Sequence, residues 1–170
     1  ADRFAVAPVL HAVLPDATFH VLTLSRNHTH LFVGDRFTLR SLRVPDLPDS
    51  LSDALWYESH ENLLNRHGGA HIGSGRPTST IHGGSASDER KDQFDRYVRK
   101  VDDAVVAALS GSKAPLVVAA VDRELAAYAA ASRYPHLMPD GIVGNPEHTK
   151  LTDLHAAAWA LVEKGLLAHD

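Results

Sequence analysis

The chain has 170 residues, 21 acidic and 17 basic side chains besides 12 histidines, and a formal net charge of −4. This length predicts one domain with a core of its own, and the absence of cysteine excludes disulfide scaffolds, thiolate metal sites and cysteine nucleophiles. The acidic balance argues against nucleic-acid binding over the whole surface, but it is compatible with a local basic patch. No apolar run approaches the ~20 residues that cross a bilayer, and no secretory leader is visible. We therefore expect a cytoplasmic protein without a membrane partner.

Three β-rich segments open the domain. Residues 19–24, 28–33 and 36–44 alternate between apolar and polar side chains and are separated by short turn sequences. In the second segment, His28 and His30 fall on the face opposite to its apolar residues. Two successive hairpins predict an N-terminal antiparallel meander.

A glycine-rich and histidine-rich segment follows. Residues 51–64 predict one or two short helical turns, and we place a long loop at 58–87. Its part from Arg66 to Ser87 holds six of the chain's 11 glycines. Loops longer than about 12–15 residues are uncommon in compact domains and are usually functional or disordered. This loop is therefore the first candidate for a functional site.

The clearest helix begins after the loop. Ser87 is a suitable N-cap, and the acidic residues that follow complement the helix dipole. Apolar residues recur at helical spacing on one stripe, which comprises Phe94, Val98, Val101, Val105, Ala108 and Leu109. The opposite side carries Asp92, Arg96, Arg99 and Asp103 and is expected to face solvent. Gly111 ends this helix.

The remaining elements alternate between strand and helix. Residues 115–121 form a continuous apolar run, typical of a strand buried on both faces. Residues 122–132 predict an alanine-rich helix, 136–143 a weak strand, and 145–164 a last helix that stops at Gly165. Three strands followed by helix–strand–helix–strand–helix predict an α/β sandwich, with a mixed sheet and helices packed on it.

Several catalytic motifs are incomplete. Ser74 stands where a phosphate-binding loop needs lysine, and the segment Gly83-Gly84-Ser85-Ala86-Ser87 has serine where a nucleophile elbow ends in glycine. Gly68 and Gly69 separate His67 from His71, so these histidines have no helical ligand spacing. We therefore expect no metal and no cofactor. A histidine-rich binding module remains an alternative interpretation of the loop.

Basic residues lie in the loop and at the start of the long helix. A solvated helix face is one interpretation, and a narrow track for RNA phosphates is the other. The candidate RNA-binding residues are Arg66, Arg76, Arg90, Lys91, Arg96 and Arg99.

Seven phrases, in this order along the chain, resemble a known family. They are Leu24-Ser25-Arg26-Asn27, Leu31-Phe32-Val33-Gly34-Asp35-Arg36, Asp53-Ala54-Leu55-Trp56-Tyr57, Ile81-His82-Gly83-Gly84-Ser85, Ala114-Pro115-Leu116-Val117-Val118, Arg133-Tyr134-Pro135-His136-Leu137 and Gly141-Ile142-Val143-Gly144-Asn145-Pro146. The chain is similar over about residues 19–163 to the middle domain of the bacterial relatives of archaeo-eukaryotic class-1 peptide release factors. That superfamily includes Pelota and ribosome-hibernation factors.

This resemblance implies an RNase H-like fold and a domain organisation. Residues 1–18 would be a lead-in from a preceding domain, 19–165 the middle domain, and 166–170 a tail. The chain begins at Ala1 without an initiator methionine, and we expect N-terminal and C-terminal partner domains in a longer protein. The resemblance implies the ribosome, with its rRNA and tRNA, as the binding partner.

The release factors carry a Gly-Gly-Gln tip that promotes hydrolysis of peptidyl-tRNA, and the resemblance places Gly83, Gly84 and Ser85 at that tip. The candidate catalytic loop is therefore His82, Gly83, Gly84 and Ser85, with serine in place of glutamine. Two glycines still permit a close backbone approach, but the side chain that could order a water molecule is missing. We expect ribosome binding near the A site or peptidyl transferase centre without efficient catalysis, in hibernation, stalling response or rescue. Peptidyl-tRNA hydrolysis by this loop is the alternative, so enzyme activity stays open.

Overall fold

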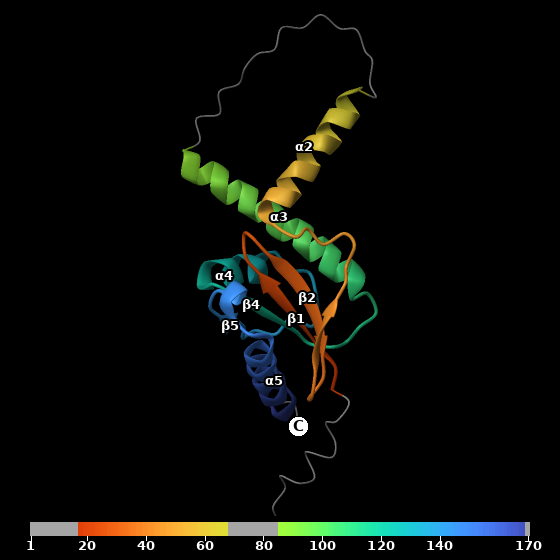
Figure 1. The fold of residues 1–170 in the computed structure, drawn as a ribbon, viewed down its shortest axis with the longest axis vertical. Helices are drawn as coiled ribbons and strands as arrows, with labels where there is room; N and C mark the ends of the chain where they lie inside the picture. The colour runs from red at the N-terminus through yellow and green to blue at the C-terminus, as the bar shows by residue number, and fades with distance from the viewer. Residues whose placement is uncertain (1–16, 68–84, 169–170) are drawn as a thin grey trace, which may run out of the picture.

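The computed structural model describes residues 17–67 and 85–168, which form a mixed five-stranded sheet with four α-helices (Figure 1). The chain is therefore of the α/β class, as the sequence predicts. The elements are β1 (Phe19–Leu24), β2 (Thr29–Gly34), β3 (Leu39–Leu42), α2 (Leu51–His67), α3 (Ala86–Ala108), β4 (Leu116–Ala120), α4 (Asp122–Ala131), β5 (Ile142–Val143), the short 3₁₀ helix η1 (Pro146–His148) and α5 (Leu151–Leu167).

The strands lie in the order β3-β2-β1-β4-β5. β1 pairs antiparallel with β2, and β2 pairs antiparallel with β3, through turns of a few residues. β1 pairs in parallel with β4, and β4 pairs in parallel with β5. Leu22 at the centre of β1 lies opposite Leu31 on one side and Val118 on the other. β1 and β4 are inner strands, which explains why every residue in both is buried.

Apolar side chains on the two faces of the sheet form two separate core clusters. One face packs against α3, α4 and the start of α2, through residues such as Val101, Tyr128 and Ala54. The other face packs against α5, through Leu154 and Ala158. The sheet thus separates α5 from the other three helices (Figure 1).

Helix α3 follows its predicted apolar stripe closely. Phe94, Val98, Val101, Val105 and Leu109 are all buried, and the four charged residues predicted to face solvent are all exposed. Ala108 is exposed, contrary to the prediction. The stripe also contains two buried polar groups that periodicity did not reveal, on Tyr97 and Asp102.

Asp102 is fully buried and ties α3 to the end of α4. One carboxylate oxygen accepts hydrogen bonds from the Tyr128 hydroxyl (3.1 Å) and the Ser132 hydroxyl (2.9 Å). The other accepts from the backbone N–H of Arg133 (3.0 Å) and from its guanidinium Nε (3.3 Å). A buried carboxylate is costly unless it is paired and hydrogen-bonded, and these four donors provide that compensation. Burial, and then the charge of Asp102, raise the pKa of the Tyr128 hydroxyl far above its ordinary value.

Tyr97 connects α3 to the turn between β1 and β2. Its hydroxyl donates to the Ser25 carbonyl (2.9 Å) and is hydrogen-bonded to the Thr29 hydroxyl. Burial raises the pKa of Tyr97 to about 12. The same turn receives the start of α2, because the Leu51 N–H donates to the Arg26 carbonyl (2.9 Å).

Several predicted elements differ from the structure. The strand predicted at 136–143 is reduced to Ile142–Val143 of β5, since Pro139 has no N–H to donate to a neighbouring strand. Residues 51–67 form one continuous helix rather than one or two short turns, so the segment predicted as loop from 58 is helical as far as His67. β3 covers Leu39–Leu42 only, because Asp35 caps the preceding turn through the N–H groups of Phe37 and Thr38 (both 2.7 Å).

A further difference concerns the last helix. Asn145 caps the short η1 instead of a long helix, and α5 begins separately at Leu151. Gly165 lies inside α5 and does not end it. A Cβ atom at Gly165 would lie 3.1 Å from the Met138 Cε, so glycine here permits a close approach between α5 and the segment before β5. The proposed lead-in lies almost wholly outside the described residues.

We expect Asp102→Ala to lower the free energy of unfolding by ~2–4 kcal/mol, because it leaves buried donors without an acceptor. Denaturant unfolding followed by circular dichroism measures this change. The matched control is Asp103→Ala, since Asp103 also pairs with Arg133 but its side chain is 66% exposed. It should cost less than about 1 kcal/mol. Equal losses in the two variants would contradict the anchoring role of Asp102.

His20 should make stability pH-dependent. Its ring is buried, its Nδ1 has no hydrogen-bond partner among the described residues, and burial lowers its pKa from 6.5 against a smaller opposing effect of the Phe32 backbone. The unfolded chain then binds a proton first, so stability is lost as the pH falls from about 6.5 towards the lowered pKa. Unfolding between pH 7.5 and 5 should show a smaller slope in His20→Leu than in His30→Gln, which alters an exposed histidine. Identical slopes would rule this out.

Candidate functional site

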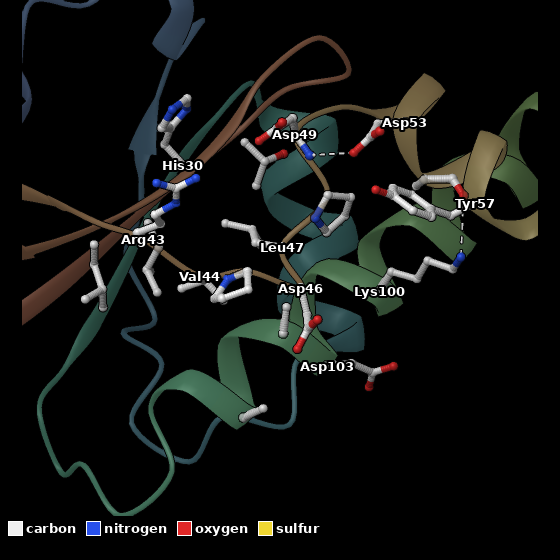
Figure 2. A pocket seen from close by; sticks show the side chains of 18 of the residues that line it. His30, Arg43, Val44, Asp46, Leu47, Asp49, Asp53, Tyr57, Lys100 and Asp103 are labelled. Carbon is white, nitrogen blue, oxygen red and sulfur yellow. Dashed lines mark hydrogen bonds between the residues drawn. The ribbon is translucent and has the colours of Figure 1, made fainter.

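Helix α3 separates two grooves on the surface. The first, which we call the α3–α4 groove, has a volume of about 730 Å³ and lies between α3 and α4. The second, the α2 groove, has a volume of about 1150 Å³ and lies among α2, α3 and the chain from β3 to Asp49 (Figure 2). The loop predicted as functional joins α2 to α3, so both grooves border helices that carry its ends.

The α3–α4 groove is lined by four cations and three carboxylates, Asp95, Asp102 and Asp103. Of the carboxylates, Asp102 is buried and Asp103 pairs with Arg133. Lys91 and Arg99 come from α3, Arg123 comes from the first turn of α4, and Arg133 follows the end of α4. The α4 side of the groove is lined by small side chains, those of Ala127, Ala130 and Ala131. Small residues there leave the groove open to a ligand that the cations can contact.

Three of these four cations are available to a ligand. Lys91, Arg99 and Arg123 are exposed and form no ion pair with another residue in the described part of the chain. Arg133 is engaged, because it pairs with both Asp102 (3.3 Å) and Asp103. Unpaired lysine and arginine side chains beside an open groove can contact an anionic chain such as a nucleic-acid backbone.

The predicted basic track on α3 is divided in the structure. Lys91 and Arg99 face the α3–α4 groove. Arg96 lies on the other side of the helix, where it pairs with Glu58 of α2 (3.4 Å). Arg90 is exposed and donates from its Nε to the Ala86 carbonyl of its own helix (2.9 Å). The structure therefore places the four residues on different sides of α3, and their contact with RNA stays a prediction.

The ion pairs of Glu58 fix α2 against α3. Its carboxylate contacts Arg96 (3.4 Å) and Lys100 (3.6 Å), and Lys100 also donates to the Ala54 carbonyl (3.4 Å). Ala54 is buried, whereas residues 59–65 are all exposed. Helix α2 is thus anchored near its start and extends away from the sheet towards its end (Figure 1).

Ser85 is the only member of the predicted catalytic loop among the described residues; His82, Gly83 and Gly84 lie outside them. Its hydroxyl caps α3: it accepts from the Asp88 N–H (3.4 Å), donates to the Asp88 carboxylate (2.9 Å) and lies 2.6 Å from the Ser87 hydroxyl. The N-cap of α3 is therefore Ser85, whereas the sequence predicts Ser87, which is wrong. Asp88 and Glu89 do lie in the first turn.

The sequence also predicts two cations in the loop, Arg66 and Arg76. Arg66 belongs to the last turn of α2, so it is helical rather than in a loop. Arg76 lies outside the described residues.

Within the described ranges, the histidines do not gather into a metal site. His28 and His30 share an exposed face, with ring centroids 6.4 Å apart, as the alternation predicts. His60 stacks on Trp56 with centroids 3.8 Å apart. Across residues 17–67 and 85–168, no group of three or more histidines and carboxylates is arranged to hold a metal ion. His71 and His82 lie outside these ranges.

A polar cluster lies where β1, β4 and β5 end. The Ser25 hydroxyl donates to the Glu147 carboxylate (2.5 Å) and holds the pKa of Glu147 below its ordinary value. Glu124 is buried, which raises its pKa, and the nearby Arg26 (3.7 Å) opposes this shift. The Arg26 guanidinium also lies over the Phe94 ring, 5.1 Å from its centroid. The charged groups of this cluster are paired with one another or hydrogen-bonded, so we interpret the cluster as a structural contact between these strand ends.

Sequence reasoning missed the contribution of α4 to the basic groove. Arg123 and Arg133 lie more than 20 residues from Lys91 and Arg99 in the chain, and only the packing of α4 on α3 brings them together. One available signal was the alanine-rich face of residues 122–132, since small side chains permit close approach of a ligand or a second helix.

The family model of bacterial archaeo-eukaryotic release factor family 3 matches residues 18–170, so the chain belongs to this family. This confirms the resemblance seen in the sequence and indicates a translation-related role. A search of curated proteins found no match. No helix in the described part of the chain is long and apolar enough to span a membrane.

Ser85→Ala should destabilise the start of α3 by ~1 kcal/mol, because it removes the capping oxygen. Ser87→Ala is the matched control, since Ser87 is exposed and lies in the first turn of α3 after the cap. It should change stability by less than half as much. Amide hydrogen exchange of residues 88–92 measures both effects, and faster exchange in Ser87→Ala than in Ser85→Ala would contradict the assignment.

Proposed function

We propose that this family member is a ribosome-associated translation factor domain that acts in hibernation, stalling response or rescue. It would bind near the A site or the peptidyl transferase centre, in the cytoplasm, without efficient catalysis. Membership of a release-factor family supports the translation role. The observation that carries the binding proposal is the set of unpaired cations at the α3–α4 groove.

In this proposal, Lys91, Arg99 and Arg123 contact phosphates of rRNA or tRNA. Lys91 and Arg99 are eight residues apart on α3, which is about 12 Å along the helix axis, and Arg123 faces them from α4. Phosphate contacts of this kind position a protein on RNA without reading its sequence. Local cations explain how a chain with a net charge of −4 can approach an RNA surface.

The state of Ser85 supports binding without efficient hydrolysis. Its hydroxyl is occupied in the cap of α3 and hydrogen-bonds a carboxylate, not a histidine that could act as a base. The chain's one glutamine, Gln93, lies inside α3, so it does not stand at the predicted tip. A role for His82, Gly83 and Gly84 in contacting the ribosome remains part of the proposal.

We also propose that the fold is of the RNase H-like type. Its support is the strand order β3-β2-β1-β4-β5, with β2 antiparallel to its neighbours and β1, β4 and β5 mutually parallel. The three N-terminal strands pair in chain order, which agrees with an antiparallel meander.

The test is co-sedimentation of the chain with bacterial ribosomes over a series of salt concentrations. A triple variant, Lys91→Gln/Arg99→Gln/Arg123→Gln, should bind more weakly at every concentration. If each cation meets one phosphate, the slope of log affinity against log salt should fall by roughly 2–3.

The control is Arg40→Gln/Lys113→Gln/Lys150→Gln, which removes the same charge from exposed positions away from the groove. It should keep most of the slope. Equal loss in both variants would reduce the effect to net charge and contradict the groove assignment. Release of labelled peptide from ribosomal peptidyl-tRNA by the chain would contradict the non-catalytic proposal and favour the hydrolase alternative.

A further inference from the structure

The α2 groove differs in charge from the α3–α4 groove, although both share α3 as a wall. Its floor is apolar, with Leu42, Val44 and Leu47 packed on the core. Carboxylates surround this floor, and Figure 2 shows Asp46, Asp49, Asp53 and Asp103 near the segment that carries Leu47. The acidic lining residues are Asp46, Asp49, Asp53, Glu61 and Asp103.

Few of these carboxylates are neutralised within the protein. Asp103 pairs with Arg133, and Asp53 accepts a hydrogen bond from the Asp49 N–H (3.2 Å). Asp46, Asp49 and Glu61, in contrast, form no ion pair in the described part of the chain. The negative potential of the groove is therefore available to a partner.

The cations of the groove do not balance this charge. Lys100 is already held by Glu58 (3.6 Å) and the Ala54 carbonyl (3.4 Å). Arg43 is the other lysine or arginine in the lining, which also contains His30. An RNA backbone would meet net repulsion here, whereas a cationic partner would be attracted.

Strand β3 supplies a second recognition feature. It is an outer strand of the described sheet, and its residues Ser41 and Leu42 line the groove. An outer strand presents backbone N–H and C=O groups that can pair with an extended segment. Across the groove, Tyr57 of α2 is 55% exposed, so its ring can stack against a lysine or arginine side chain.

We propose that the α2 groove binds an extended, lysine-rich or arginine-rich segment of a protein partner, which lies along β3. Acidic side chains and Tyr57 would contact its cations, and the apolar floor would receive its alternate side chains. This inference goes beyond the proposed RNA contact and does not depend on it, because it uses the other side of α3.

The test titrates the chain into a fluorescein-labelled decapeptide of alternating lysine and threonine, followed by fluorescence anisotropy. A decapeptide of alternating serine and threonine is the neutral reference. The variant Asp46→Asn/Asp49→Asn should weaken binding of the basic peptide roughly fivefold or more. The backbone bonds of Asp49, including the one from Thr29 (2.9 Å), are unaffected by this change, so the fold should persist.

The matched control is Asp92→Asn/Asp140→Asn, which removes two exposed carboxylates outside the groove and should weaken binding less than twofold. Amide chemical shifts should move at residues 41–49 and in α2 when the basic peptide is added. Equal weakening by both variants, equal binding of the neutral peptide, shifts confined to other surfaces, or displacement of the peptide by an RNA oligonucleotide bound at residues 41–49 would each overturn the proposal.

Discussion

The buried carboxylate of Asp102 is the constraint on which the functional surfaces depend. Removal of a carboxylate from water costs several kcal/mol, and only complete hydrogen bonding of its oxygens offsets this cost. Asp102 obtains this from Tyr128, Ser132 and the backbone and side chain of Arg133. These partners all lie at one end of α4, so α3 can take only one position against it. The α3–α4 groove has a fixed shape for the same reason.

Helix α3 extends from this fixed contact with α4 to its exposed first turns. Its second half is held by the sheet and by Asp102, and Tyr97 fixes its middle to the β1–β2 turn. The first turns lie beyond the last buried side chain, Phe94, and are exposed. Glu58 attaches α2 to the same helix through Arg96 and Lys100. The residues that flank the segment from 68 to 84 thus belong to α2 and α3, and each of these helices packs on the core at its other end.

Local periodicity determined how far sequence reasoning could go. It predicted β1, β4 and the buried stripe of α3, because burial of one face or of both leaves a regular apolar pattern. It failed for α2, whose apolar residues Trp56 and Leu64 are exposed and so produce no stripe. The pairing of Asp102 with Arg133 spans 31 positions and leaves no local trace. Family membership was predicted from the order of short phrases. The position of Arg123 beside Lys91 and Arg99, in contrast, depends on the packing of α4 on α3, which no local pattern reveals.

The two grooves that border α3 differ in their balance of acidic and basic side chains. Lys91 and Arg99 of α3 line the α3–α4 groove, whereas Lys100 lines the α2 groove, where carboxylates outnumber the cations. Asp103 lines both grooves. Complementary potentials select partners and orientation more than they add affinity. A ribosome presents both an anionic RNA surface and basic protein segments, so our two proposals assign a different kind of contact to each groove. The sign of the net charge therefore says little about binding, because the local balance of charge differs between the two grooves.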